Sequence, residues 1–273
     1  MKKLLNILFL LFTITALISA ASVNILTDKN FGNILTDQNG KTLYFFSNDA
    51  VPDSSACLGK CLENWPVFYS ENLTLDNSLN KNDFGTITHK DGTKQNTYKG
   101  WPLYYYKNDI KKGDISGDKV GNLWFVAKPD YSIMLVNNNL KGMDNNFYDK
   151  SNKKITAPSD SSKVTYLTDS HGTTLYIFTK DEKNKNNYSK PDNKNDVWPV
   201  YETGANIIVP SILNKKDFTI ITVSNGKKQI TYKGHPLYFF ANDNYEKGNT
   251  KGVSVPSPGV WPVADKDLPE LQK

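Results

Sequence analysis

The sequence predicts an all-β protein with two tandem, pseudo-repeated β domains, each a small barrel or sandwich made of two hairpin-based units. A tyrosine is followed five positions later by an aspartate in four places, and a tryptophan follows each aspartate 15 to 18 residues further on. Short runs of β-forming residues alternate with turn residues along the chain, and no run keeps a helical period with capping residues. Short strands and frequent turns at such spacing are typical of a sandwich or small barrel.

The four tyrosine–aspartate pairs are Tyr44/Asp49, Tyr104/Asp109, Tyr176/Asp181 and Tyr238/Asp243. The tryptophans that follow them are Trp65, Trp124, Trp198 and Trp261. The first and third units resemble each other more than they resemble the second and fourth, and a long break follows Asp130. Two domains of two units each therefore fit better than a four-bladed propeller. We expect a signal peptide at residues 1–21, the first β domain at 32–130, a linker at 131–162 and the second β domain at 163–267.

Turn residues place the strands of the first domain. Asn39-Gly40 lies between two runs of β-formers, and a two-residue hairpin turn needs the positive φ that these residues tolerate. Asp91-Gly92 has the same setting in the second unit. The strands expected in this domain are Thr42–Phe46, Thr86–His89, Lys94–Tyr98, Leu103–Tyr106 and Leu123–Ala127.

The second domain copies this plan, and the stretch between the domains reads as a connector. Its expected strands are Thr165–Thr168, Thr174–Phe178, Phe218–Val223, Lys228–Tyr232 and Val260–Ala264. Ser132–Val136 is compatible with a short strand, whereas Asn137–Ser162 is dense in Asn, Lys, Asp and Ser. Such a composition buries little surface and predicts a linker or mobile loop.

The N-terminus and the net charge indicate where the protein is located and which class of partner is not expected. Lys2-Lys3, an apolar run over residues 4–18 and the small residues Ser19–Ala21 are typical of a cleaved secretory signal peptide. No later segment is apolar enough to span a membrane, and no cysteine near the cleavage site could accept a lipid. The net charge of +5 falls to about +3 without the leader, and all 33 basic residues are lysines, so a nucleic-acid partner is not expected.

Cys57 and Cys61 are the only cysteines. In an exported protein such a close pair predicts a disulfide, which would stiffen one loop. An alternative is a copper site in which these two thiolates are helped by His89 or by Met134 and Met143, because soft ligands suit copper.

The tyrosine–aspartate pairs have two interpretations. A buried tyrosine needs a partner for its hydroxyl group, and the aspartate just past the strand end could supply one or cap the following turn. The alternative is a cation or sugar site built from the four acids and nearby aromatic rings. The recurrence of the pairs in four units with different loops favours a structural role for all eight residues.

Trp101 differs from the other tryptophans because its counterpart in the second domain is His235. A position that accepts two unlike side chains is expected to be partly exposed, so Trp101 and His235 form the candidate ligand surface. His89, His171 and His235 occupy unrelated places and lack metal-ligand spacing. The sequence carries no recognised nucleophile, metalloprotease or phosphate-loop pattern, so neither an enzymatic activity nor a cofactor is expected.

Together these marks resemble a known family. Gly32–Tyr44, Asp49 and Cys57–Pro66, followed by Lys99–Tyr104 and its copy Lys233–Tyr238, resemble the bacterial secreted repeats of envelope lipoproteins with a tyrosine-x4-aspartate motif. The resemblance covers nearly all of the chain after the leader. It implies a bacterial cell envelope and tandem repeats, and carries no agreed activity. The chain departs from the family in lacking the lipid-accepting cysteine, and its second half lacks the cysteine pair.

The sequence therefore predicts an exported, non-enzymatic binding or interaction module in the periplasm or secreted from the cell. Its partner would be an envelope protein or a small ligand. Two alternatives stay open: a copper-handling or redox accessory protein that uses Cys57 and Cys61, and a carbohydrate-binding protein that uses Trp101 and nearby tyrosines.

Overall fold

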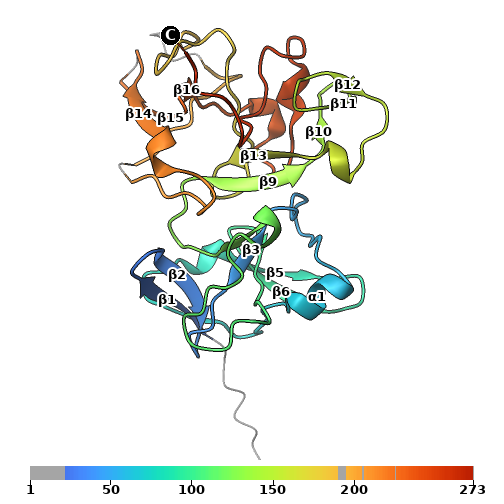
Figure 1. Cartoon of the computed structure of the whole chain (residues 1–273), viewed down its shortest axis with the longest axis vertical. Coiled ribbons are helices and arrows are strands. Elements are labelled where there is room, and N and C mark those ends of the chain that lie inside the picture. Colours follow the sequence, from blue (N-terminus) through green and yellow to red (C-terminus); the bar gives the residue numbers. More distant parts are fainter. Residues whose placement is uncertain (1–21, 190–194, 205, 225, 273) are drawn as a thin grey trace, which may run out of the picture.

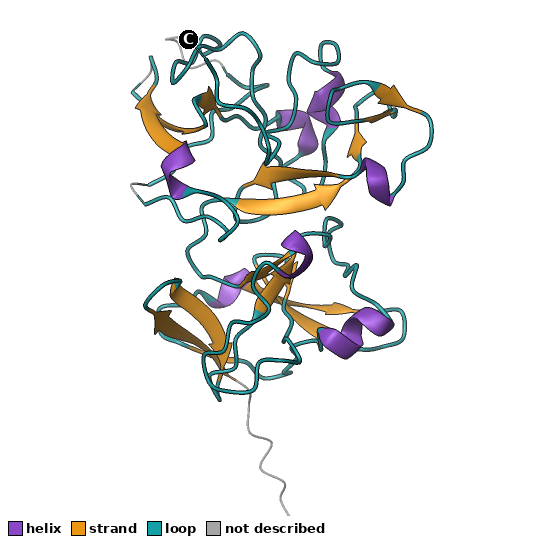
Figure 2. Ribbon diagram, in the orientation of Figure 1, coloured by secondary structure: helices purple, strands orange, loops and turns teal. Residues whose placement is uncertain are grey.

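The computed structural model describes residues 22–189, 195–204, 206–224 and 226–272, so the expected leader at 1–21 lies outside it. Two lobes follow each other along the long axis, the N-terminal half of the chain in one and the C-terminal half in the other (Figure 1). Strands in small sheets dominate, helices are short, and loops fill the rest (Figure 2). The all-β prediction is confirmed, with sheets of two or three strands that close no barrel in the described part of the chain.

The first lobe contains three small sheets. β1 (Ser22–Asp28) and β2 (Gly32–Asp37) form an antiparallel hairpin, and β4 (Thr74–Leu75) runs parallel to β1. β5 (Phe84–Thr88), β6 (Lys94–Tyr98) and β7 (Trp101–Pro102) form an antiparallel sheet with β5 at its edge. β3 (Tyr44–Phe46) pairs with β8 (Trp124–Val126). The helices here are α1 (Lys60–Asn64) and the 3₁₀ turns η1 (Lys81–Asp83) and η2 (Val120–Asn122).

The second lobe repeats the arrangement with one insertion. β9 (Met134–Asn138) pairs with β13 (Val164–Thr168), and β14 (Phe218–Thr222), β15 (Lys228–Tyr232) and β16 (His235–Pro236) match β5, β6 and β7. Between β9 and β13 lies a small sheet of β10 (Leu140–Lys141), β11 (Phe147–Tyr148) and β12 (Lys154–Ile155). The 3₁₀ turns are η3 (Asp160–Ser162), η4 (Lys215–Asp217), η5 (Ala241–Asp243) and η6 (Lys251–Ser254).

The stretch expected to be a linker, 131–162, is folded. β9 belongs to the second lobe, where it takes the place that β1 has in the first. Ile133, Leu135 and Tyr148 are buried in spite of the many polar residues around them. The expectation of a mobile connector was wrong because a few apolar residues at alternate positions suffice to anchor short strands.

Within each lobe the two units interlock. Tyr44 and Tyr104 face each other across a two-fold-like bridge, in which each backbone N–H donates to the other's carbonyl at 2.9 and 3.1 Å. β3 of the first unit pairs with the tryptophan strand of the second, and Val67 of the first unit pairs with Tyr104 of the second. The second lobe uses the same pairings around Tyr176 and Tyr238. One unit alone would leave its central strand without these hydrogen bonds, so the folding unit is a pair.

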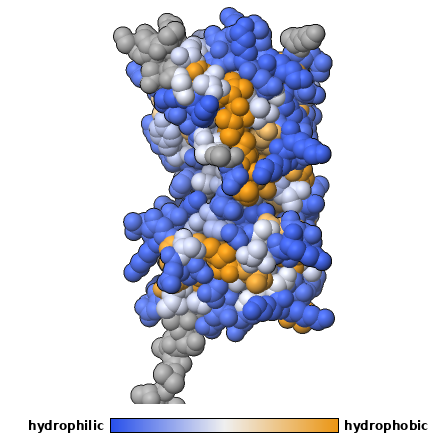
Figure 3. All heavy atoms as spheres, turned by 90° about the vertical axis from the view of Figure 1, so that its left-hand side faces the viewer, coloured by the Kyte–Doolittle hydropathy of each residue, from blue (hydrophilic) through white to orange (hydrophobic). Residues whose placement is uncertain are grey.

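The largest hydrophobic cluster contains side chains from both lobes. Phe45 contacts Trp101 and Tyr131, with ring centroids 6.0 and 6.4 Å apart. On the face seen in Figure 3, hydrophilic side chains dominate, and apolar ones collect in a strip on the upper lobe and a smaller patch on the lower. Among the described residues, no helix has the length and apolar character to cross a membrane.

Candidate functional site

The four tyrosine–aspartate pairs recur in space, but each tyrosine binds the aspartate of the other unit in its lobe. In the first lobe, the Tyr44 hydroxyl donates to Asp109 Oδ2 at 2.5 Å and the Tyr104 hydroxyl donates to Asp49 Oδ2 at 2.8 Å. In the second lobe, Tyr176 donates to Asp243 at 2.5 Å and Tyr238 donates to Asp181 at 2.7 Å. The hydrogen bonds therefore cross between units in both lobes.

The other carboxylate oxygen of each aspartate accepts a backbone N–H from its own following loop. The donors are Ala56 for Asp49 at 2.7 Å, Ser116 for Asp109 at 2.9 Å, Asn187 for Asp181 at 2.7 Å and Lys251 for Asp243 at 2.9 Å. Each aspartate thus joins the central tyrosine of one unit to the loop of the other. A group whose two oxygens are both engaged inside the fold suits a structural role better than a ligand site.

Burial shifts the titration of these acids. Loss of hydration raises the pKa of Asp49 to about 7, and raises those of Asp181 and Asp243 to about 6. The pKa of Asp109 is also raised by burial. Burial of the four partner tyrosines, together with the nearby aspartates, raises the pKa of each phenol far above its usual range. Each phenol therefore stays a neutral hydrogen-bond donor.

Stacked aromatic rings lie beside each crossed pair. Trp65 and Trp124, from the two units of the first lobe, stack with centroids 3.7 Å apart, and Trp198 and Trp261 stack at 3.9 Å in the second. Phe46 extends the first stack at 4.0 Å. All four tryptophans are buried, so they belong to the core that joins the units.

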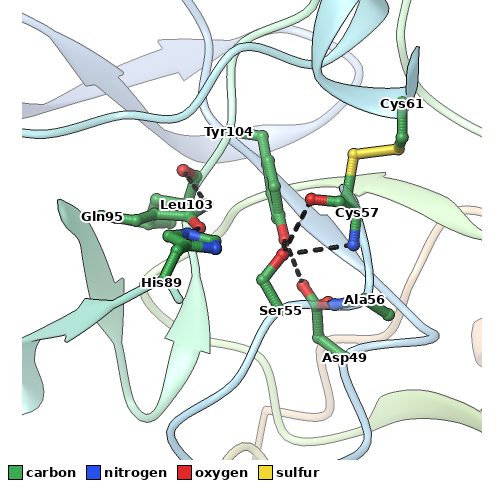
Figure 4. The surroundings of a disulfide bond; sticks show 9 residues. All are labelled: Asp49, Ser55, Ala56, Cys57, Cys61, His89, Gln95, Leu103 and Tyr104. Atoms are coloured by element: carbon green, nitrogen blue, oxygen red, sulfur yellow. Dashed lines mark hydrogen bonds between the residues drawn. A yellow bond between two sulfur atoms is a disulfide. The ribbon is translucent and has the colours of Figure 1, made fainter. Parts of the chain in front are cut away.

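The disulfide loop is specific to the first lobe. Cys57 and Cys61 form the expected disulfide, which confirms that prediction. Cys57 is fully buried, and the Ser55 hydroxyl beside it lies 2.6 Å from the Tyr104 hydroxyl (Figure 4). The loop is therefore fastened at two points, by the disulfide and through the hydrogen bonds of Asp49 and Tyr104.

A groove of about 450 Å³ lies beside this loop. Leu58 and Leu62 line one side, and Ile87, Thr88 and His89 from the end of β5 line the other. Leu58 is 58% exposed, which is high for a leucine. Asp53 and Asp91 also line the groove, so it combines apolar side chains with charged groups.

The copper alternative lacks free thiolates in this state. Both sulfur atoms are in the disulfide, and His89 Nε2 lies 2.8 Å from Gln95 Oε1 (Figure 4). Within the described ranges, no group of three or more potential ligands could hold a metal ion. Metal binding through the cysteines would require prior reduction of the disulfide.

Trp101 and His235 do not form an exposed surface. Trp101 is 1% exposed because the second lobe covers it, and its indole N–H donates to the Ser170 carbonyl at 3.1 Å. His235 is 8% exposed and lies 3.1 Å from the Pro269 carbonyl. The expectation of partial exposure was wrong. The two unlike side chains occupy equivalent positions, but the second lobe covers Trp101 and the chain near Pro269 covers His235. Stacking of a sugar on Trp101, the basis of the carbohydrate alternative, would require the lobes to separate.

Lys247 was missed by reasoning from the sequence. It is 7% exposed, and its ammonium group donates to the Gly100 carbonyl at 2.7 Å and lies 4.7 Å from the Trp101 ring centroid. Burial lowers its pKa to about 8, against the opposing effect of Asp49. Nothing near Lys247 in the sequence distinguishes it from the many surface lysines.

Paired units that close through crossed hydrogen bonds and stacked rings define a tandem-repeat β protein. The family model of a secreted repeat of unknown function, Lipoprotein_15, matches residues 26–69, 85–128 and 219–265. The chain belongs to this family of secreted repeats, as its motifs suggested. Residues 163–202 lie outside the three matches, yet β13, Tyr176, Asp181 and Trp198 take the places of β2, Tyr44, Asp49 and Trp65. No curated protein and no solved structure matches the chain.

Proposed function

We propose that the protein is an exported, non-catalytic binding module of the bacterial cell envelope, and that the groove beside the disulfide loop is its binding surface. The observation that carries the proposal is the exposed Leu58 on a loop that is fastened at two points. A loop held in its binding conformation loses little entropy when a partner docks. The crossed tyrosine–aspartate pairs then serve as the frame that holds this loop.

The partner we propose is an extended peptide segment with an apolar side chain. β5 is the edge strand of its sheet, so its outer backbone groups are open to pairing with an added strand. Its end also lines the groove through Ile87 and Thr88. A peptide along β5 would place an apolar side chain against Leu58 and Leu62, and its backbone against the strand.

Selection from a displayed library of random peptides tests this proposal. We expect enriched peptides to contain apolar residues and to bind at least tenfold more weakly to Leu58→Asp, because a carboxylate would replace an apolar side chain that lines the groove. Val197→Asp, at an exposed valine in the second lobe (48% exposed), is the matched control and should bind normally. Peptides that bind Leu58→Asp and the unaltered protein equally well would place the binding surface elsewhere.

A further inference from the structure

The contact between the lobes shows how one pair of units docks on another. Trp101 lies in β7, directly after the turn at residues 99–100 that follows β6, and Ser170 and Lys247 of the second lobe cover it. A Cβ atom at Gly248 would collide with the backbone of Ala50, so the lobes meet closely there. The docking face of the second lobe is therefore the turn at 169–172 together with the loop at 244–248.

The first lobe carries a copy of this docking face, which we call the head face (Gly40, Ile110, Lys112 and Gly113). In the second lobe, the Lys247 side chain packs over Gly172, and Gly248 N–H donates to the Gly172 carbonyl at 3.4 Å. In the first lobe, the Lys112 side chain packs over Gly40 in the same way, and Gly113 N–H donates to the Gly40 carbonyl at 2.9 Å.

The two large side chains of the head face are exposed. Lys112 is exposed and forms no hydrogen bond or ion pair with the part of the chain that the structure describes. Ile110 is 83% exposed, the highest value among the large hydrophobic residues described. Lys112 therefore has over Gly40 the placement that Lys247 has over Gly172, where Lys247 binds Trp101, and an exposed isoleucine lies two residues before it.

The second lobe carries the complementary tail face (Lys233–Pro236), which is the counterpart of residues 99–102, the turn and strand β7 that contain Trp101. Here the segment 267–271 lies across it. The Leu271 N–H donates to the Lys233 carbonyl at 2.9 Å, His235 Nε2 lies 3.1 Å from the Pro269 carbonyl, and Glu270 pairs with Lys183 at 2.6 Å.

The segment that follows Pro129 in the first lobe and the equivalent segment that follows Lys266 in the second lobe take different paths. The Tyr98 hydroxyl donates to the Pro129 carbonyl at 3.0 Å, and its counterpart Tyr232 donates to the Lys266 carbonyl at 2.6 Å, so the chain follows the same path up to these points. After Pro129 the chain enters the second lobe, which then covers Trp101. After Lys266 the chain instead turns back over His235. Residues 267–271 thus occupy the place that a following lobe would take.

We propose that the segment 267–271 is a removable cap, and that the tail face beneath it binds the head face of a second copy of this chain. The contact is head to tail, so each copy can bind one neighbour at each end, which gives open chains or closed rings and does not stop at a two-copy contact. Lys112 of one copy reaches the Gly234 carbonyl of the next, and comes near Asp181 as Lys247 comes near Asp49. A capped end face keeps the repeat protein from associating in this way, as terminal repeats do in solenoids.

Sedimentation velocity of the protein without residues 267–273 tests the proposal. We expect its average mass to rise with concentration past that of a dimer, whereas the full-length protein stays a monomer at the same concentrations. The double variant Glu270→Lys/Leu271→Asp should do the same with a smaller disturbance. His235→Trp in the shortened protein should tighten the association, because it restores the ring that the docking face binds in the internal contact.

The control removes the other half of the contact. Lys112→Glu/Ile110→Asp in the shortened protein should return it to a monomer, with an unchanged near-ultraviolet circular dichroism spectrum. A folded, shortened protein that stays a monomer, or an association that survives Lys112→Glu/Ile110→Asp, would overturn the proposal. Unfolding of both cap variants would overturn it too, since a cap must come off without loss of the fold.

Discussion

The hydroxyl group of each central tyrosine has a specific partner that neighbours in the sequence do not provide. The Tyr104 hydroxyl donates to Asp49, which lies 55 positions before it in the sequence. The Ser55 hydroxyl also lies 2.6 Å from the Tyr104 hydroxyl. Removal of the tyrosine hydroxyl would leave buried acceptors without their donor, and such a loss costs more than an exposed hydrogen bond does.

Tyr104→Phe should therefore lower the free energy of unfolding by about 1–3 kcal/mol. Tyr69→Phe is the matched control, because Tyr69 is 36% exposed and surface changes usually stay within about 0.5 kcal/mol. Denaturant melts of the two variants would compare them directly. Equal stabilities would remove the structural role that we assign to the buried phenol.

The buried acids predict a pH dependence of stability. Asp49, Asp181 and Asp243 have pKa values of about 7, 6 and 6 in the folded protein, above the ordinary value of 3.8. At pH values between 3.8 and these raised pKa values, the folded state binds more protons than the unfolded state does. The free energy of unfolding therefore falls as the pH rises through this range. Thermal melts should give a higher midpoint at pH 5 than at pH 8. Asp49→Asn should flatten this slope, whereas a midpoint that rises over the interval would contradict the assignment.

At the scale of the elements, glycines let the loops close over the ring stacks. A Cβ atom at Gly252 would lie 2.7 Å from Trp198 and 2.8 Å from Tyr176, and one at Gly117 would lie 2.9 Å from Trp65 and Tyr44. Contacts this short are not tolerated between real atoms, so these positions admit no side chain without a shift of the core.

Gly252→Ala should accordingly destabilise the protein by about 1–3 kcal/mol through overpacking. Gly204→Ala is the control, since a Cβ atom there meets no atom within 4 Å. Both variants can be followed by thermal unfolding. A neutral Gly252→Ala would mean that the loop at η6 is free to move away from the rings.

Prediction from the sequence succeeded for features that local residue patterns determine. It failed where contacts with a distant part of the chain determine the burial or the partner of a residue. The all-β class and the disulfide follow from spacing and residue type. The expected partner of each tyrosine, the aspartate just past its own strand, was wrong, because each tyrosine binds the aspartate of the other unit. The sequence could not show this crossing, because it depends on how the two units pack. It also could not show that Trp101 is buried, since its cover comes from Lys247 and Ser170 in the other lobe.

Prediction from the sequence also failed for short strands that lie among polar residues. Residues 131–162 have the composition of a linker, and the strands β10, β11 and β12 within them are two residues each. Strands of that length carry too few residues for alternation to show, so only their buried side chains, such as Leu140 and Tyr148, mark them.

For the whole molecule, the central claim is that each lobe is one folding unit made of two interlocked repeats. The crossed hydrogen bonds, the shared tryptophan stacks and the exchanged strand pairs all follow from it. The two lobes of the chain are two such pairs, and they meet in one contact around Trp101 and Lys247.

A double-mutant cycle tests this claim most directly. Tyr44→Phe combined with Asp109→Asn should show a coupling energy of about 1 kcal/mol or more, because the two groups share one buried hydrogen bond. Tyr44→Phe combined with Asp49→Asn, the aspartate of its own unit, should be close to additive. Strong coupling of Tyr44 to Asp49, with none to Asp109, would contradict the crossed arrangement and the interlocked pair built on it.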